Sequence, residues 1–272
     1  MTTYTRPTAI IVSRDSFDSE DSLQIVESNI SFINALLTHH LQIDEISVYA
    51  LQSYYVDYYL AQIENGGFSQ FVYNSRWSRA TVDLITDGLK SMGASQHLAL
   101  FNKAESRLNQ LEPEDLERFF ESDYFGENEE RDFLNQYSDE FYTLDEEEDL
   151  AALNAQWLRQ HPHLVVMTID EMYADLERQV ASIPDIESRV AEALAQEPRY
   201  TKIIRKFCHE YELDFDCVTA GVPTEYNGED VVAWYFVSAE GPYYMIETDG
   251  NAFMFDANSD KLVGKITGLD DD

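Results

Sequence analysis

The sequence predicts an α+β protein, with a mainly α-helical N-terminal domain followed by a small α+β module that contains an antiparallel β-meander. Up to about residue 183, apolar residues recur at the three- and four-residue spacing of amphipathic helices. From Asp214 onward the period becomes that of strands, and turn residues separate the apolar runs. We therefore expect a helical domain over residues 1–183, with its core in about 21–161, and the module over residues 184–272.

The helical domain begins after a loose lead-in, in which Ala9–Val12 is a candidate strand. Asp21 or Ser22 is expected to cap a first helix that carries the apolar residues from Leu23 to Leu37. The same apolar spacing predicts further helices over Asp44–Glu64, Ser78–Met92, Ser95–Leu111, a segment that begins at Pro113, Glu129–Phe141, Glu146–Arg159, Ile169–Ala181, Asp185–Gln196 and a segment around Ile203–Tyr211.

The strands of the module are expected over Val231–Val237, Tyr243–Thr248, Asn251–Phe255 and Leu262–Ile266. Asp249 and Gly250 stand between two alternating aromatic segments, and this dipeptide favours the tight turn of a β-hairpin. The sequence therefore predicts that these strands pair in the order in which they occur.

A tyrosine-rich apolar segment ends at Asn65, Gly66 and Gly67, and apolar residues resume directly afterwards. Because glycine adopts positive φ at little cost, the pair is expected to end one helix and to return the chain as a hairpin of helices. We interpret this stretch as a structural corner. The alternative is a small polar site formed by Asn65, Gln70 and Asn74, although amides at a sharp turn also satisfy the local backbone.

This stretch resembles the signature of the bacterial DNA-mimic protein nineteen family. The residues that carry the resemblance are Asn65, Gly66, Gly67, Phe68, Gln70, Phe71, Tyr73 and Asn74. The resemblance extends over about residues 43–161 and does not continue beyond about Pro184. It implies a mostly helical cytoplasmic domain. It also implies the best-known role in that family, an acidic dimer that occupies the DNA-binding surface of a transcription factor, so a homodimer is one expected state.

The charge of the chain indicates the kind of partner. Lys and Arg number 18 against 52 Asp and Glu, which gives a formal net charge of −34. Such a protein repels phosphates and anionic membrane surfaces and attracts basic proteins. We therefore expect a basic protein partner and no direct binding to nucleic acid or to a membrane.

Acidic residues are concentrated between Glu112 and Asp149, where seventeen of them stand against Arg118 and Arg131. Carboxylates on successive helices can replace a phosphate backbone as the ligand of Lys and Arg. The alternatives are a solubilising surface and, for Asp145–Asp149, acid that favours a helix N-terminus. The predicted partner-binding residues are Glu114, Asp115, Glu117, Glu121, Asp123, Glu127, Glu129, Glu130, Asp132, Asp139, Glu140, Asp145, Glu146, Glu147, Glu148 and Asp149.

Patterns of metal, disulfide and catalytic sites are missing from the sequence. Cys208 and Cys217 have no C-x-x-C spacing, and the six histidines have no metal-binding spacing. No phosphate-binding glycine loop or nucleophile-elbow pattern occurs. We expect reduced thiols, no metal, no cofactor and no enzymatic activity. The N-terminus has neither a signal peptide pattern nor a membrane-spanning run, which predicts a cytoplasmic protein.

These observations predict a non-enzymatic acidic inhibitor that binds the basic nucleic-acid-binding surface of a partner protein. Such an inhibitor would act as a DNA mimic, with a transcription regulator as one expected partner. The alternative is an immunity protein that neutralises a bacterial toxin such as a nuclease, with specific contacts from the C-terminal module. Both interpretations require a basic partner.

Overall fold

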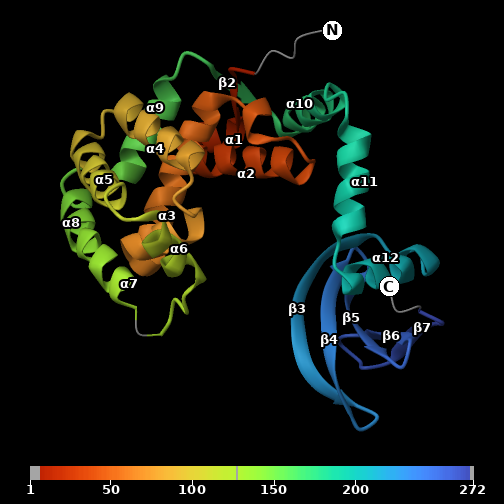
Figure 1. Ribbon diagram of the computed structural model, residues 1–272. Coiled ribbons are helices and arrows are strands. Elements are labelled where there is room, and N and C mark those ends of the chain that lie inside the picture. The colour runs from red at the N-terminus through yellow and green to blue at the C-terminus, as the bar shows by residue number, and fades with distance from the viewer. Residues whose placement is uncertain (1–6, 127, 270–272) are drawn as a thin grey trace. The chain divides into compact units, whose positions relative to one another are not determined.

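The computed structural model describes residues 7–126 and 128–269 (Figure 1). The predicted fold class is confirmed, because helices dominate the N-terminal part and a five-stranded antiparallel sheet forms the C-terminal part. Contacts between Cα atoms divide the chain into two compact units, Met1–Ile186 and Glu187–Asp272. Whether a boundary near residue 183 separates two independently folding domains stays a prediction.

The N-terminal unit combines helices with one pair of short strands. Its strands β1 (Ile10–Ser13) and β2 (Leu164–Met167) pair in parallel, with Ile10 opposite Leu164. Its helices are α1 (Arg14–Asp18), α2 (Gln24–Thr38), the 3-10 helix Ile43–Glu45, α3 (Val48–Ser75), α4 (Arg79–Met92), α5 (Ser95–Leu108), α6 (Pro113–Glu121), α7 (Glu129–Leu134), α8 (Gln136–Asp145), α9 (Leu150–Gln160) and α10 (Ile169–Ala181).

Three details of the predicted helices are wrong. The residue that precedes α2 is Leu23, and the Asp21 carboxylate accepts a hydrogen bond from its backbone nitrogen instead of capping the helix. The predicted helix Glu129–Phe141 is two helices, α7 and α8, because Asn135 lies between them and its side chain bonds to another element. The helix predicted from Glu146 begins only at Leu150, because Asp149 caps it by accepting from Ala152.

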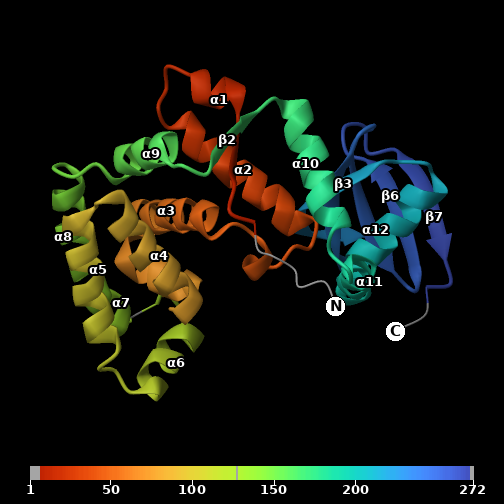
Figure 2. The same cartoon turned by 90° about the horizontal axis from the view of Figure 1, so that it is seen from above.

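Helix α3 runs through two hydrophobic clusters that together form the core of the N-terminal unit. Its first turns carry Ala50 and Leu51 into the cluster around β1, α2 and α9. Its later turns carry Tyr59, Phe68 and Phe71 into an aromatic cluster with residues of α4, α5 and α8. Figure 2 shows α4 beside α3 and α5 beside α4. Because both clusters depend on α3, a change in its course alters the whole unit.

The C-terminal unit is a five-stranded meander with a helix on one face. The helices α11 (Ile186–Gln196) and α12 (Arg199–Glu210) precede strands β3 (Phe215–Tyr226), β4 (Glu229–Ser238), β5 (Gly241–Thr248), β6 (Asn251–Asp256) and β7 (Leu262–Thr267). Neighbouring strands pair in sequence order, all antiparallel. Helix α12 places Ile204 and Phe207 against Phe236 and Met254 of the sheet.

The hairpin predicted at Asp249 and Gly250 is present. Both residues have positive φ, 50° and 66°, between strands that pair from Thr248 and Asn251. Strand β3 was not predicted, because its sequence contains Gly221 and Pro223 and is mostly exposed.

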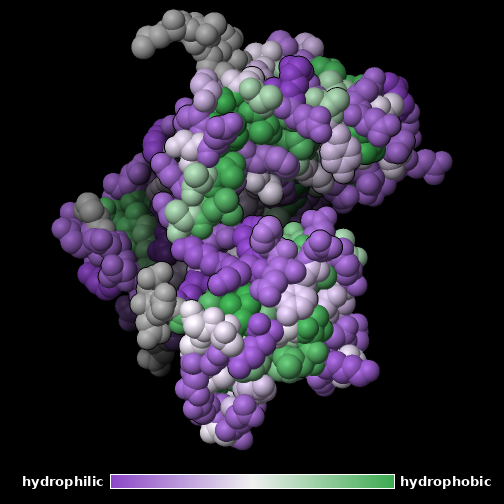
Figure 3. Space-filling model, turned by 90° about the vertical axis from the view of Figure 1, so that its right-hand side faces the viewer, coloured by the Kyte–Doolittle hydropathy of each residue, from purple (hydrophilic) through white to green (hydrophobic). Residues whose placement is uncertain are grey.

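The surface in Figure 3 is mostly hydrophilic, and its hydrophobic residues form separate patches. Among the helices of residues 7–126 and 128–269, none combines the length and the apolar character needed to cross a bilayer.

Candidate functional site

The glycine pair bends helix α3 and does not produce the predicted hairpin. Gly66 has φ −159° and ψ 20°, and Gly67 has φ 83° and ψ 177°, while the residues on both sides are helical. Only Gly67 needs the freedom of glycine, since its φ is positive. The chain re-enters a helix at once, because the side chains of Ser138 in α8 and of Asn135, which directly precedes α8, accept hydrogen bonds from backbone nitrogens after the bend.

Four side chains satisfy the backbone groups that the bend exposes. Ser138 accepts from the Phe68 nitrogen at 2.8 Å, and Asn135 accepts from the Ser69 nitrogen at 3.3 Å. The Tyr142 hydroxyl donates to the Ile63 carbonyl at 2.7 Å. The Tyr124 hydroxyl lies 3.3 Å from the Gly66 carbonyl and 2.8 Å from the Ser69 hydroxyl. These contacts give the corner a structural role, since buried backbone groups need such partners.

Polar residues of the same stretch line a cavity of about 410 Å³. Its lining residues come from α3 and from the segment after α6, and they are Asn65, Gln70, Tyr73, Asn74, Ser122, Asp123, Tyr124 and Phe125. The three amides that the sequence marked as a possible polar site are therefore brought together. The four lining residues after α6 were not part of that expectation, because they belong to a loop about fifty positions away.

Part of the predicted acidic array serves the fold. The Glu148 carboxylate accepts from the backbone nitrogens of Gln96 and His97 at 3.0 and 3.1 Å, at the start of α5. Asp149 accepts from the Ala152 nitrogen at 2.8 Å, and Asp145 accepts from the Leu150 nitrogen at 3.0 Å. The expectation that this run lies in the first turn of a helix is wrong, because α9 begins only at Leu150 and has no acidic residue in its first turn. Asp149 instead precedes α9 as its cap, and Glu148 binds the start of α5.

A second group of predicted residues has partners close to the surface. The Arg118 guanidinium lies 2.9 Å from the Asp115 carboxylate and 3.8 Å from that of Glu130, so it connects α6 with α7. Two further ion pairs join Lys103 with Glu140 at 2.5 Å and Arg131 with Asp132 at 2.8 Å. The Asp123 carboxylate accepts a hydrogen bond from the Phe125 backbone nitrogen at 3.1 Å. Exposed ion pairs of this kind contribute little to stability, and their carboxylates stay accessible.

The remaining predicted residues form the exposed part of the array. Their side chains have no hydrogen bond or ion pair within residues 7–126 and 128–269, and they are Glu114, Glu117, Glu121, Glu129, Asp139, Glu146 and Glu147. Glu127 lies outside the described residues. These carboxylates come from α6, α7, α8 and the turn that follows α8. Whether they contact a partner stays a prediction.

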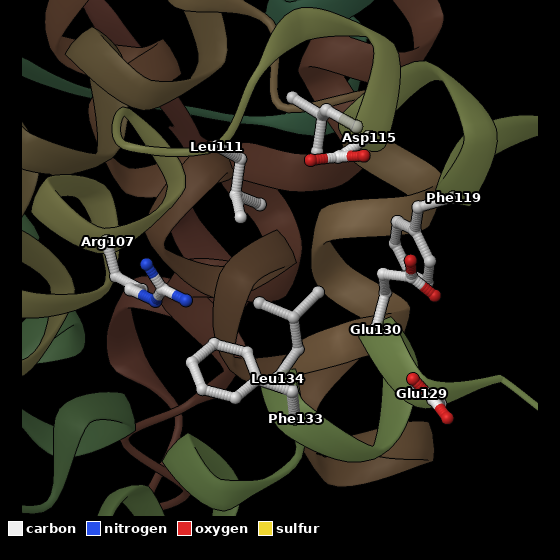
Figure 4. A pocket seen from close by; sticks show the side chains of 9 residues that line it. Arg107, Leu111, Asp115, Phe119, Glu129, Glu130, Phe133 and Leu134 are labelled. Atoms are coloured by element: carbon white, nitrogen blue, oxygen red, sulfur yellow. The ribbon is translucent and has the colours of Figure 1, made fainter.

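Helices α5, α6 and α7 enclose a pocket of about 200 Å³ within the acidic region. Its wall is apolar and includes Leu111, Phe119 and Leu134. Figure 4 shows Arg107 on one side of the pocket and the carboxylates of Asp115, Glu129 and Glu130 on the other. The Arg107 guanidinium lies 5.0 Å from the centre of the Phe133 ring. The acidic region is therefore a shaped surface with an apolar depression.

Metal and thiol chemistry receive little support from the described residues. No group of three or more His, Cys, Asp or Glu side chains in residues 7–126 and 128–269 has the arrangement of a metal site. Cys208 is buried and Cys217 is exposed, and both are free thiols. Burial raises the pKa of the Cys208 thiol to about 11, which disfavours the reactive thiolate.

Comparison with known proteins bears on one segment of the chain. No curated protein and no solved structure matches it. Less than half of the chain, residues 44–161, matches the protein family described as DMP19-like protein. This segment extends from the 3-10 helix before α3 to the end of α9 and contains both the corner and the acidic helices. The resemblance to the DNA-mimic protein nineteen family is therefore confirmed, and the N-terminal unit contains a DMP19-like region over residues 44–161.

Proposed function

We propose that this protein is a non-enzymatic inhibitor whose acidic helices occupy the basic nucleic-acid-binding surface of a partner protein. One observation supports the proposal: α6, α7 and α8 carry exposed carboxylates in succession, inside the DMP19-like region. Those of Glu117, Glu121, Glu129 and Asp139 have no ion pair within residues 7–126 and 128–269. Duplex DNA presents about one charge per 1.7 Å of its axis, and proteins bind it largely through Lys and Arg. A folded array of carboxylates competes for those same cations.

The spacing of these carboxylates suits a charge surrogate. Glu117 and Glu121 are one helical turn apart on α6, and neighbours at this spacing repel each other by a few tenths of a kcal/mol. A basic partner relieves that repulsion when it binds. Since exposed charges are screened over about 8 Å at physiological ionic strength, the affinity of such a complex falls steeply as salt rises.

The experiment begins with capture of partners from the native cytoplasm on the full-length chain. The expected partner is a basic nucleic-acid-binding protein, and duplex DNA is expected to displace it. A first variant neutralises four exposed carboxylates of the array, Glu117→Gln, Glu121→Gln, Glu129→Gln and Asp139→Asn. It should bind the captured partner about tenfold more weakly, mainly through slower association.

A matched control neutralises four exposed carboxylates of the C-terminal unit, Glu187→Gln, Glu192→Gln, Asp216→Asn and Glu225→Gln. Both variants lose the same formal charge, so the comparison separates a local array from the overall charge. The proposal requires that the control retain most of the affinity. If the control loses binding while the first variant keeps it, the acidic helices are not the interface, and the immunity alternative with contacts from the C-terminal module becomes the better hypothesis.

A further inference from the structure

We propose that the cavity beside the α3 corner is a pocket for a guanidinium group, and that its occupant is an arginine side chain of the partner. The inference rests on the proposed function for the identity of the partner, but the chemistry of the pocket is argued from its own lining. The cavity, of about 410 Å³, has room for one long side chain.

Two amide side chains of the cavity use their nitrogens in hydrogen bonds to one acceptor. The Gln62 side-chain oxygen accepts from the Gln70 amide nitrogen at 3.2 Å and from the Asn74 amide nitrogen at 2.6 Å. Because the nitrogens are used in this way, the carbonyl oxygens are the acceptors that these two amides can offer, and the Gln70 oxygen lies beside Gly66. The Asp123 carboxylate, with one oxygen on the Phe125 nitrogen at 3.1 Å, has its second oxygen as a further acceptor. Such a lining favours a ligand with several donors.

The other side of the cavity is aromatic. This side is lined by Tyr73, Tyr124 and Phe125. The Phe125 residue is 90% exposed to solvent. Planar guanidinium groups stack on aromatic faces and donate in the plane of the group, so rings and acceptor oxygens together suit arginine better than lysine. The neighbouring surface already shows this contact: the Arg76 guanidinium lies 5.2 Å from the Tyr73 ring centre and 5.3 Å from that of Phe120.

The charge of the lining argues against an anionic or nucleotide ligand. Among the described lining residues the only charged one is Asp123, and the chain as a whole carries −34. Two cations lie beside the lining, but Arg76 donates to the Phe120 carbonyl, and Arg131 donates to the Tyr124 carbonyl and to the Asp132 carboxylate. A phosphate would therefore meet the Asp123 carboxylate while the nearby guanidinium groups already have acceptors. A guanidinium instead gains a charge-assisted hydrogen bond from the same group.

The test uses N-acetylarginine N-methylamide as the probe and the full-length chain labelled with ¹⁵N. The expected result is saturable, millimolar binding that shifts the backbone signals of Gly66 and Gly67 and the side-chain amide signals of Asn65, Gln70 and Asn74. The citrulline analogue has the same shape without the charge and should bind at least tenfold more weakly. The lysine analogue should bind several-fold more weakly, because it lacks the planar fork.

Two variants of equal charge locate the site. Asp123→Asn keeps an oxygen for the Phe125 nitrogen and should weaken arginine binding about tenfold. Asp216→Asn removes one exposed carboxylate of the C-terminal unit and should leave arginine binding unchanged. Equal binding of citrulline or lysine, equal losses in both variants, or an absence of shifts at the corner would each overturn the proposal. Because the probe meets the free protein, failure here leaves the array hypothesis standing, and failure of the partner experiment leaves the pocket assignment standing.

Discussion

Substitution of Gly67 by alanine tests the structural interpretation of the corner. At φ 83° and ψ 177° the backbone is in a region that is almost restricted to glycine, and another residue there costs about 1–3 kcal/mol. A Cβ on Gly67 would also lie 2.6 Å from the Asn135 side-chain oxygen and 2.8 Å from the Ser138 hydroxyl. Both atoms would have to move, and these are the acceptors for the Ser69 and Phe68 nitrogens.

The expected loss is therefore larger than backbone strain alone. Two weakened hydrogen bonds add about 0.5–1.5 kcal/mol each, so the free energy of unfolding should fall by about 2–6 kcal/mol. For a unit of this size, 1 kcal/mol corresponds to about 2–4 °C in melting temperature. Calorimetry on the full chain should show the transition of the N-terminal unit lowered by about 4 °C or more.

Gly93 provides a matched control for Gly67→Ala. Its φ is also positive, 75°, but a Cβ there would have no heavy atom within 4 Å. Gly93→Ala should therefore cost only about 1 kcal/mol, the strain of the left-handed conformation. The difference between the two variants measures the displacement of Asn135 and Ser138. If Gly67→Ala melts no lower than Gly93→Ala, the contacts from α8 do not hold the corner, and our account of the bend is wrong.

Three further predictions concern single side chains. Burial, together with Glu64 and Glu27, raises the pKa of Asp57 to about 6, so the free energy of unfolding falls as the folded protein must ionise this group between about pH 4 and pH 6. Asp57→Asn should therefore raise the free energy of unfolding at pH 7 by about 1 kcal/mol and leave it unchanged at pH 4, as thermal melts at both pH values would show. Glu148→Ala should lower the free energy of unfolding by about 1 kcal/mol, because it removes the cap on α5. In denaturant titration the exposed-site control Glu147→Ala should stay within about 0.5 kcal/mol of the parent, and equal effects of the two variants would contradict the capping role. A thiol reagent at pH 8 should label exposed Cys217 quickly and buried Cys208 only on unfolding, an order that Cys217→Ser would test by removing the fast phase.

Local patterns predicted most of the elements, and contacts between distant segments explain the errors. The helices before residue 183 and the Asp249–Gly250 hairpin depend on nearby residues, so apolar period and turn chemistry were sufficient. The corner did not become a hairpin because Asn135 and Ser138, about seventy positions away, cap the helix that resumes after Gly67. The same use of Asn135 divides the helix that the sequence predicted as continuous over Glu129–Phe141.

The candidate site shows this limit most clearly. The sequence presents Asp145–Asp149 as one acidic run, but Glu148 binds backbone nitrogens about fifty positions earlier and Asp149 caps its own helix, while Glu146 and Glu147 stay exposed. Spacing alone cannot separate these roles, because the partner of each carboxylate is fixed only when α5, α8 and α9 pack. A phosphate surrogate can use only charges that the fold does not already bind. Under the proposed function we therefore expect the exposed carboxylates on α6, α7 and α8 to contact the partner. Neutralising Glu148 or Asp149 is expected to destabilise the fold instead, because these carboxylates bind backbone nitrogens at the starts of α5 and α9.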